Sequence, residues 1–212
     1  MKIEIWSDIA CPFCYIGKRH LEKALQQLPD LEVDIVWKSF ELDPNAPTES
    51  NLDIYDTLAK KYGRDREWAK QMNANMVQMA ANAGLSFNMD EVKPTNSFDA
   101  HQLLHLARER GKQDEMKEAL LSAYFTEGKH VGKPETLVQI ATDIGLDKNE
   151  AEKVLENNSY SGQVVNDVEE AHRLGVQAVP FFYINEKYGL SGAQPVEVFK
   201  EALQKISEEK VS

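Results

Sequence analysis

The sequence predicts an α/β protein whose sheet-forming ends are separated by a long all-helical segment. Three observations support this fold class. The chain begins in the order strand, helix, strand; it then reads as helix almost throughout between about residues 51 and 158; and it returns to a β-rich segment and a last helix. Strands at both ends indicate one sheet that is completed across the helical segment.

The first elements are predicted from a change in hydrophobic period. Residues 2–6 alternate polar and apolar, which places Ile3 and Ile5 on one face of a strand. From residue 12 to 28, apolar residues recur with a period near 3.6, as in an amphipathic helix. Pro12 suits the first turn of that helix, where its missing N–H costs nothing. Residues 32–42 read as a second strand.

A turn-rich segment, residues 43–48, marks the predicted domain boundary. We divide the chain into a discontinuous domain, residues 1–45 and 159–212, and a helical insertion domain, residues 46–158. Within the insertion the expected helices are 51–62, 64–83, 98–110, 113–127, 134–144 and 148–156.

The returning part of the chain changes period once more. Residues 163–174 are predicted to form a helix, and residues 178–185 are rich in aromatic and β-branched side chains, which indicates a strand. Residues 185–192 can form a hairpin turn and a short strand. Pro195 then opens a last amphipathic helix.

Composition argues against several classes of function. The chain has 212 residues, of which 42% are hydrophobic and 28% charged, and its net charge is −11. Such an acidic protein lacks the basic patch that nucleic acids or anionic membranes require. No apolar stretch is long enough to span a bilayer. Glu4 and Asp8 interrupt any apolar signal core near the start, so we expect a cytoplasmic protein.

Cys11 and Cys14 are the two cysteines of the chain, and they lie where the first strand meets the first helix. Free N–H groups and a partial positive charge at a helix N-terminus stabilise a thiolate. In Cys-x-x-Cys motifs the thiol pKa can fall from ~8.5 to roughly 3.5–7. We therefore expect Cys11 to attack a disulfide and Cys14 to resolve the mixed disulfide.

Three other roles fit the pair less well. A zinc site would need two more ligands, and His101 and His105, four apart on a helix, are expected to be solvated. A purely structural disulfide would close too short a loop to stabilise the fold much. Two unreactive core cysteines would not require a strand-to-helix turn with a proline between them. We therefore expect no metal and predict thiol–disulfide exchange.

Four segments carry a family resemblance: Ser7-Asp8-Ile9-Ala10-Cys11-Pro12-Phe13-Cys14-Tyr15-Ile16-Gly17, Asn96-Ser97-Phe98-Asp99-Ala100-His101, Gly175-Val176-Gln177-Ala178-Val179-Pro180-Phe181-Phe182 and Ser191-Gly192-Ala193-Gln194-Pro195. With these segments the chain resembles the DsbA-like branch of the thioredoxin superfamily, in particular its cytoplasmic FrnE-like members. The resemblance spans nearly the whole chain. It implies a thioredoxin-like core, a central mixed sheet flanked by helices, that is split by the helical insertion.

The resemblance also implies roles for particular residues. Pro180 would be a cis-proline facing the cysteines, and the backbone of Val179 would pair with an extended substrate as an added strand. With Pro12 and Phe13 inside the motif, these are the expected substrate-binding residues. The insertion would form one wall of the cleft, where three methionines share a face as core or as contact surface: Met72, Met76 and Met79.

The sequence departs from the family pattern at two places. Many thioredoxin-like proteins carry a buried acid six residues before the first cysteine, but Ile5 occupies that position here. Water or Glu41 are then the candidate proton carriers for Cys14. The inner dipeptide is Pro-Phe, whereas strongly oxidising periplasmic relatives carry Pro-His. This difference implies a less oxidising pair, and ~30 mV corresponds to ~1.4 kcal/mol between the redox forms.

An alternative function is a glutathione-dependent isomerase or transferase. Similar folds, such as 2-hydroxychromene-2-carboxylate isomerases and kappa-class glutathione transferases, use a serine where this chain has Cys11. Glutathione could also enter the cleft as a co-substrate, held by the Val179 backbone and the Asn96 side chain. A binding module with an inactive motif is a third possibility. The expected partners are a disulfide-containing protein or small molecule and an unspecified electron donor, without a tightly bound cofactor.

Overall fold

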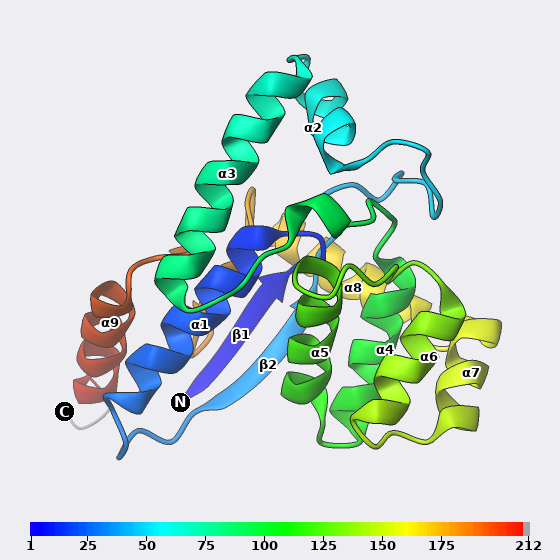
Figure 1. The fold of residues 1–212 in the computed structure, drawn as a ribbon. Helices are drawn as coiled ribbons and strands as arrows, with labels where there is room; N and C mark the ends of the chain where they lie inside the picture. The colour runs from blue at the N-terminus through cyan, green and yellow to red at the C-terminus, as the bar shows by residue number, and fades with distance from the viewer. Residues whose placement is uncertain (210–212) are drawn as a thin grey trace.

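A computed structural model describes residues 1–209 of the chain (Figure 1). Residues 210–212, which we assigned to the discontinuous domain, lie outside the described residues. The core is formed by β1 (Lys2–Ser7), α1 (Pro12–Gln26), β2 (Asp34–Ser39), β3 (Phe181–Ile184), β4 (Tyr188–Ser191) and α9 (Val196–Glu208). Between β2 and β3 lie α2 (Ile54–Tyr62), α3 (Arg66–Ala83), a 3₁₀ turn (Met89–Glu91), α4 (Phe98–Glu109), α5 (Gln113–Phe125), α6 (Pro134–Asp143), α7 (Lys148–Asn157) and α8 (Ser161–Arg173).

The strands form one mixed sheet in the order β2-β1-β3-β4. β1 runs parallel to β2 and antiparallel to β3, and β3 is antiparallel to β4. Strands from both ends of the chain therefore share one sheet, as predicted. Two strands are shorter than expected, because β2 ends at Ser39 and residues 178–180 form a loop before β3.

Helices cover both faces of the sheet (Figure 1). On one face, α1 and α9 pack on the sheet through a cluster that includes Ile5, Leu21, Phe182, Phe199 and Leu203. On the other face, Ala171 of α8 packs in a cluster with Trp6 and the two cysteines. The cysteine motif therefore lies at the end of β1, between these layers.

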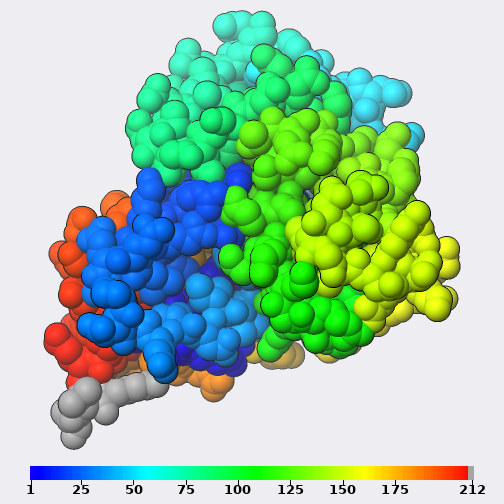
Figure 2. Space-filling model, turned by 60° about the horizontal axis from the view of Figure 1, so that its bottom comes forward, coloured from blue at the N-terminus to red at the C-terminus, as the bar shows by residue number. Residues whose placement is uncertain are grey.

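The helical insertion has its own hydrophobic core, and the motif contributes to it. Ile9, Tyr15 and Ile16, on both sides of Cys11, pack into the cluster that α4, α5 and α6 build. Figure 2 shows the blue surface of the first forty residues bordered by the teal surface of α3 and the green surface of α5. The first turns of α1 are therefore held by the sheet and by the insertion together.

The outer edge of β2 is paired with side chains instead of with another strand. The Gln113 side chain of α5 accepts a hydrogen bond from the Trp37 N–H (3.0 Å) and donates one to the Trp37 carbonyl (2.8 Å). Asp167 of α8 accepts a hydrogen bond from the Ser39 N–H (2.8 Å). Because an open strand edge is prone to unwanted pairing, α5 and α8 complete the sheet as well as covering it.

Candidate active site

Both cysteines are reduced and buried at the start of α1. Cys11 is the N-cap residue of the helix, and its backbone carbonyl accepts the N–H of Cys14 (3.0 Å). Pro12 follows at the first helical position, as predicted. Cys14 is fully buried, Cys11 is 3% exposed, and Phe13 between them is 40% exposed. Phe13 is therefore the cysteine-motif side chain that is exposed to solvent, and the Cys14 sulfur is shielded from it.

The loop before β3 faces the motif from the other end of the chain. The Val179–Pro180 peptide is cis, as the resemblance predicts. The Cys11 thiol donates a hydrogen bond to the Val179 carbonyl, with an Sγ–O distance of 3.6 Å. Trp6 packs in the same cluster as the two cysteines and Val179. The fold thus joins residues that lie nearly 170 positions apart.

The two thiols ionise as a pair, and their environments differ. The hydrogen bond to Cys14, together with burial, raises the pKa of Cys11. Burial alone would also raise the pKa of Cys14, but the hydrogen bond from Cys11, the Lys117 charge and the Ser7 hydroxyl outweigh it and lower that pKa. In this geometry the pKa of Cys14 lies below that of Cys11, whose thiol donates to the Val179 carbonyl. The helix N-terminus, on which the sequence expectation rests, is thus one of several influences on the two thiols, and the attacking role of Cys11 stays a prediction.

A buried carboxylate stands directly before the motif. Asp8 accepts hydrogen bonds from the Leu42 N–H (2.7 Å), the Ser97 hydroxyl (2.7 Å) and the Ala10 N–H (3.2 Å). Its burial opposes ionisation, but His101 and these donors keep the pKa of Asp8 below its usual range. Asp8 therefore stays ionised and ties the motif loop to the insertion.

Lys117 of α5 is a residue that the sequence reading missed. Its side chain is fully buried, and its ammonium donates to the carbonyl of Ser7 at the end of β1 (3.4 Å). A signal was present, because Lys117 falls between Gln113 and Leu120 at helical spacing and so shares the inward face of α5. Polar residues at such positions are buried with a partner or a role.

The sequence expectation about two histidines near the site is wrong. His101 and His105 are buried, not solvated, because α4 is covered by other helices. They face different partners, with His101 Nε2 3.4 Å from Asp8 Oδ1 and His105 Nε2 3.1 Å from the Ser39 hydroxyl. Within residues 1–209, no group of three His, Cys, Asp or Glu side chains is placed to hold a metal ion.

The other residues that the sequence suggested for substrate contact or proton transfer differ in their burial and in their partners. Asn96 is already engaged, because its side chain accepts a hydrogen bond from the Phe98 N–H (2.8 Å) at the start of α4 and donates one to the Pro44 carbonyl (3.2 Å). Glu41 is half-buried, and burial together with the Asp8 charge raises its pKa to about 7. Of the three methionines on α3, Met76 is core, Met72 is half-buried and Met79 is 44% exposed.

A small hollow lies beside the motif loop. Its volume is about 150 Å³, and it opens between Ala10, the segment after β2, and α2. Apolar lining comes from Leu42, Pro47, Ile54 and Leu58. A larger hollow of about 560 Å³, between α6 and α7, contains no residue of the motif. The small hollow is also lined by none of residues 11–14, but Asp8 and Ala10 place it directly beside the loop that leads to Cys11.

Comparison with known proteins identifies the family. A family model described as the DSBA-like thioredoxin domain matches residues 2–204. The chain belongs to this family. The resemblance to DsbA-like proteins and the predicted fold class are thereby confirmed. Among residues 1–209, no helix has the length and apolar character needed to cross a membrane.

Solved structures of similar proteins extend the comparison. A crystal structure described as a probable DsbA oxidoreductase from Streptomyces coelicolor is 40% identical, has a TM-score of 0.93, and covers 99% of this chain and 91% of its own. A 2-hydroxychromene-2-carboxylate isomerase is 15% identical, with a TM-score of 0.73 and coverage of 100% and 98%. The cytosolic disulfide reductase DsbM from Pseudomonas aeruginosa, solved with GSH, is 14% identical, with a TM-score of 0.69 and coverage of 98% and 100%. The last two show a shared fold alone.

Proposed function

We propose that this DsbA-like protein catalyses dithiol–disulfide exchange through Cys11 and Cys14, as a reductase or isomerase of protein or small-molecule disulfides. The observation that carries the proposal is the placement of the motif. Two reduced cysteines stand at the N-terminus of α1, and the Cys11 thiol lies 3.6 Å from the carbonyl of Val179, before a cis-proline.

The reaction proceeds through a mixed disulfide. The Cys11 sulfur attacks one sulfur of the substrate disulfide, and the departing substrate thiolate takes the proton that Cys11 loses. Cys14 then attacks the Cys11 sulfur, which forms the Cys11–Cys14 disulfide and releases the second substrate thiolate. Two electrons pass from the dithiol to the substrate, and the reverse sequence would oxidise a substrate dithiol.

The substrate is held along the Val179 segment. An extended peptide can pair with the Val179 backbone, while Pro12, Phe13 and Pro180 border the reacting sulfur. The exposed Phe13 ring offers an apolar contact. Glutathione is the candidate co-substrate and electron donor, and the DsbM structure with GSH supports this choice by its fold. A cytoplasmic location and the FrnE-like branch belong to the same proposal.

The deciding measurement is the reduction potential of the Cys11–Cys14 pair, obtained by equilibration in glutathione buffers. Trp6 packs in the same cluster as both sulfurs, so its fluorescence can report the redox state. We expect a reversible two-electron couple. A protein that forms no intramolecular disulfide at any glutathione ratio would overturn the proposal.

Cysteine variants test the two roles separately. Cys11→Ser should abolish turnover of a disulfide substrate, because it removes the attacking sulfur. Cys14→Ser should accumulate a mixed disulfide on Cys11, visible as a mass increase of one substrate thiol. Turnover by Cys11→Ser, or a Cys14→Ser protein that traps no substrate, would contradict these assignments.

A glutathione-dependent isomerase is the second candidate, favoured by the likeness to the 2-hydroxychromene-2-carboxylate isomerase fold. Against it stands Cys11, where such enzymes use a serine. The Cys11→Ser variant distinguishes the two functions, because it restores that serine while removing redox chemistry. Isomerisation of a 2-hydroxychromene carboxylate by this variant with glutathione would favour the isomerase.

A further inference from the structure

Lys117 is a buried cation without a carboxylate partner. Its side chain is 0% exposed, and among residues 1–209 no Asp or Glu oxygen lies within 4.0 Å of its ammonium. Its contacts are the Ser7 carbonyl (3.4 Å) and the Trp37 ring, whose centroid lies 5.4 Å away. Burying an ammonium is unfavourable unless a counter-charge is near.

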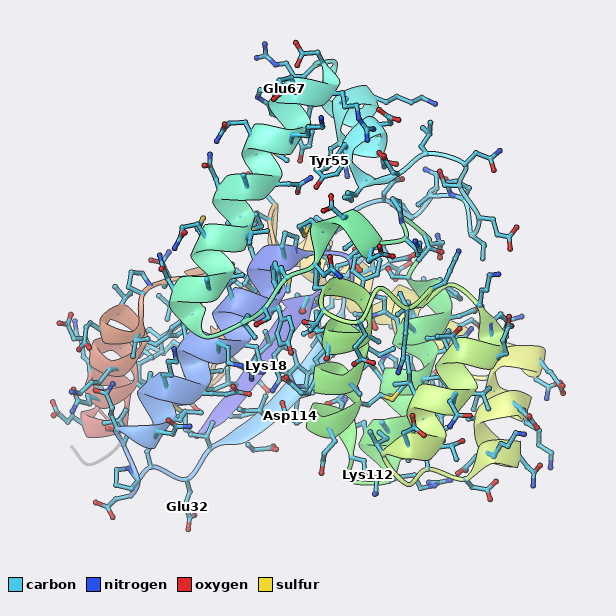
Figure 3. All side chains as sticks on the ribbon, in the orientation of Figure 1. Lys18, Glu32, Tyr55, Glu67, Lys112 and Asp114 are labelled. Carbon is cyan, nitrogen blue, oxygen red and sulfur yellow. The ribbon has the colours of Figure 1, made fainter. Side chains whose placement is uncertain are left out.

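Lys18, the neighbouring buried lysine, is neutralised by carboxylates, which is the usual arrangement for a buried ammonium. Its side chain is 3% exposed, yet it forms ion pairs with Glu22, Asp114 (3.1 Å) and Glu118 (3.1 Å) at the boundary of α1 and α5. Figure 3 shows Lys18 and Asp114 at this boundary. Lys117 lies on the same helix, α5, as Asp114 and Glu118, but its ammonium turns inward to the end of β1 instead. Its position is therefore not explained by an ion pair that stabilises the fold.

The charges that act on Lys117 come from the active site. Burial lowers the pKa of Lys117 to about 8, and the negative charges of Cys14, Asp8 and Cys11 oppose this shift, while Lys18 adds to it. Asp8 is already satisfied by three hydrogen bonds. The Ser7 hydroxyl, next to the carbonyl that Lys117 contacts, is buried without a hydrogen-bond partner of its own. The Lys117 ammonium and the Ser7 hydroxyl thus both lie at the end of β1, and both lower the pKa of Cys14.

We propose that Lys117 is the counter-charge of the Cys14 thiolate. It would take the role in controlling the ionisation of the second cysteine that a buried acid before the motif has in many thioredoxin-like proteins. The inference rests on the proposed disulfide exchange and deepens it. Ile5, at the position of that acid, cannot hold or move a proton. Lys117 is among the largest influences on the pKa of Cys14, whereas the largest influences on the two cysteines do not include Glu41.

The proton balance of the reaction accounts for the lysine. When Cys14 ionises beside the Lys117 ammonium, the thiolate and the ammonium together carry no net charge, and Cys11 is still a thiol. Cys11 attacks the substrate and its proton leaves with the first substrate thiol. The Cys14 thiolate then displaces the second substrate thiolate, which takes a proton from water. Lys117, now without its counter-charge, releases one proton to solvent, so two electrons and two protons leave the protein.

Titration of Cys14 alone tests the inference without turnover. In a Cys11→Ser background, the thiolate absorbance near 240 nm reports Cys14 as pH is raised. We expect Lys117→Met to raise the Cys14 pKa by about one unit or more, equivalent to about a tenfold change in the ionisation constant, and Lys117→Arg to restore part of the shift. Lys18→Met is the matched control, and it should leave the Cys14 titration close to that of the parent.

A second readout follows the resolving step. The single-cysteine background cannot resolve, so Lys117→Met is also made with both cysteines and reacted with oxidised glutathione. The mixed disulfide should form readily and decay about tenfold more slowly or worse than in the parent, since less Cys14 is thiolate. Methionine has nearly the same length and removes a buried charge, so the variant should fold, and circular dichroism verifies this.

The outcomes separate the two proposals. An unchanged Cys14 titration and an unchanged decay of the mixed disulfide in folded Lys117→Met would overturn the role of Lys117, while a reversible couple would leave disulfide exchange intact. A Cys14 pKa that shifts in Lys117→Met, in a protein that forms no reversible Cys11–Cys14 disulfide, would support the role of Lys117 and overturn disulfide exchange. A Glu41→Gln variant that slows resolution while Lys117→Met does not would transfer the role to Glu41.

Discussion

His101 is a buried histidine that should make the fold sensitive to acid. Its side chain is 0% exposed, and its two ring nitrogens lack hydrogen bonds of good geometry, although Asp8 lies 3.4 Å from Nε2. Burial lowers the pKa of His101, an effect that Asp8 only partly offsets. Below the unfolded-state pKa of about 6.5, the unfolded chain therefore binds more protons than the folded one.

The sign of this linkage defines a prediction. The stability that depends on neutral His101 is complete above about pH 6.5 and is lost as pH falls, by up to about 1.4 kcal/mol per pH unit. We expect His101→Gln to show a shallower fall in unfolding free energy below pH 6.5 than the parent, measured by urea unfolding at several pH values. His172→Gln, an exposed histidine on α8, is the control. Equal slopes for parent and His101→Gln would disprove the assignment.

At the scale of elements, α1 approaches the cis-proline loop closely because Gly17 has no side chain. A Cβ on Gly17 would lie 2.9 Å from Pro180 Cγ and 3.4 Å from the Phe182 ring. The proline ring is tied to the backbone and cannot swing away. The glycine therefore sets the distance between the helix that carries the cysteines and the loop that faces them.

Gly17→Ala should consequently destabilise the protein although alanine is the better helix former. Overpacking costs about 1–3 kcal/mol, which outweighs the ~1 kcal/mol that alanine contributes in a helix. Gly162→Ala on α8 is the matched control, because nothing lies within 4 Å of its added Cβ, and it should stabilise by up to about 1 kcal/mol. Thermal or urea unfolding of both variants decides the matter, and a Gly17→Ala protein as stable as the control would refute the packing argument.

Local chemistry made most helices predictable from the sequence. The starts of α1 at Pro12, α4 at Phe98, α5 at Gln113 and α6 at Pro134 agree with the predicted residues, because prolines and a change of period mark them. The family resemblance predicted that the Val179–Pro180 segment faces Cys11. No local pattern could have predicted it, because the two segments lie so far apart in the sequence. Helical spacing alone places Lys117 on the inward face of α5, but its contact with Ser7 depends on how α5 packs against the sheet, which no local pattern shows. The influence of Lys117 on the pKa of Cys14 could therefore not be predicted from the sequence.

At the scale of the whole molecule, the insertion and the sheet are joined by hydrogen bonds as well as by packing. Gln113 is 8% exposed, and its amide satisfies both the N–H and the carbonyl of Trp37 on the outer edge of β2. The Trp37 ring nitrogen donates to Asp114 on the same helix (2.9 Å). A buried backbone group that loses its partner costs about 1–3 kcal/mol. The edge of the core sheet is thus stable only while α5 is in place.

Gln113→Leu tests whether the two parts unfold together. The variant keeps the side-chain volume but leaves two backbone groups of Trp37 unpaired, so we expect a loss of about 2–4 kcal/mol in unfolding free energy. Gln139→Leu is the control: its amide bonds Asp143 on the exposed face of α6 (2.7 Å), and its removal should change stability by less than about 0.5 kcal/mol. If α5 and the sheet form one cooperative unit, tryptophan fluorescence and far-ultraviolet dichroism should shift together in a single urea transition. A midpoint equal to that of Gln139→Leu would show that the Gln113 contacts are dispensable. Two separated transitions would instead show that the insertion unfolds independently of the sheet, and that the motif, which packs on both, loses one of its supports first.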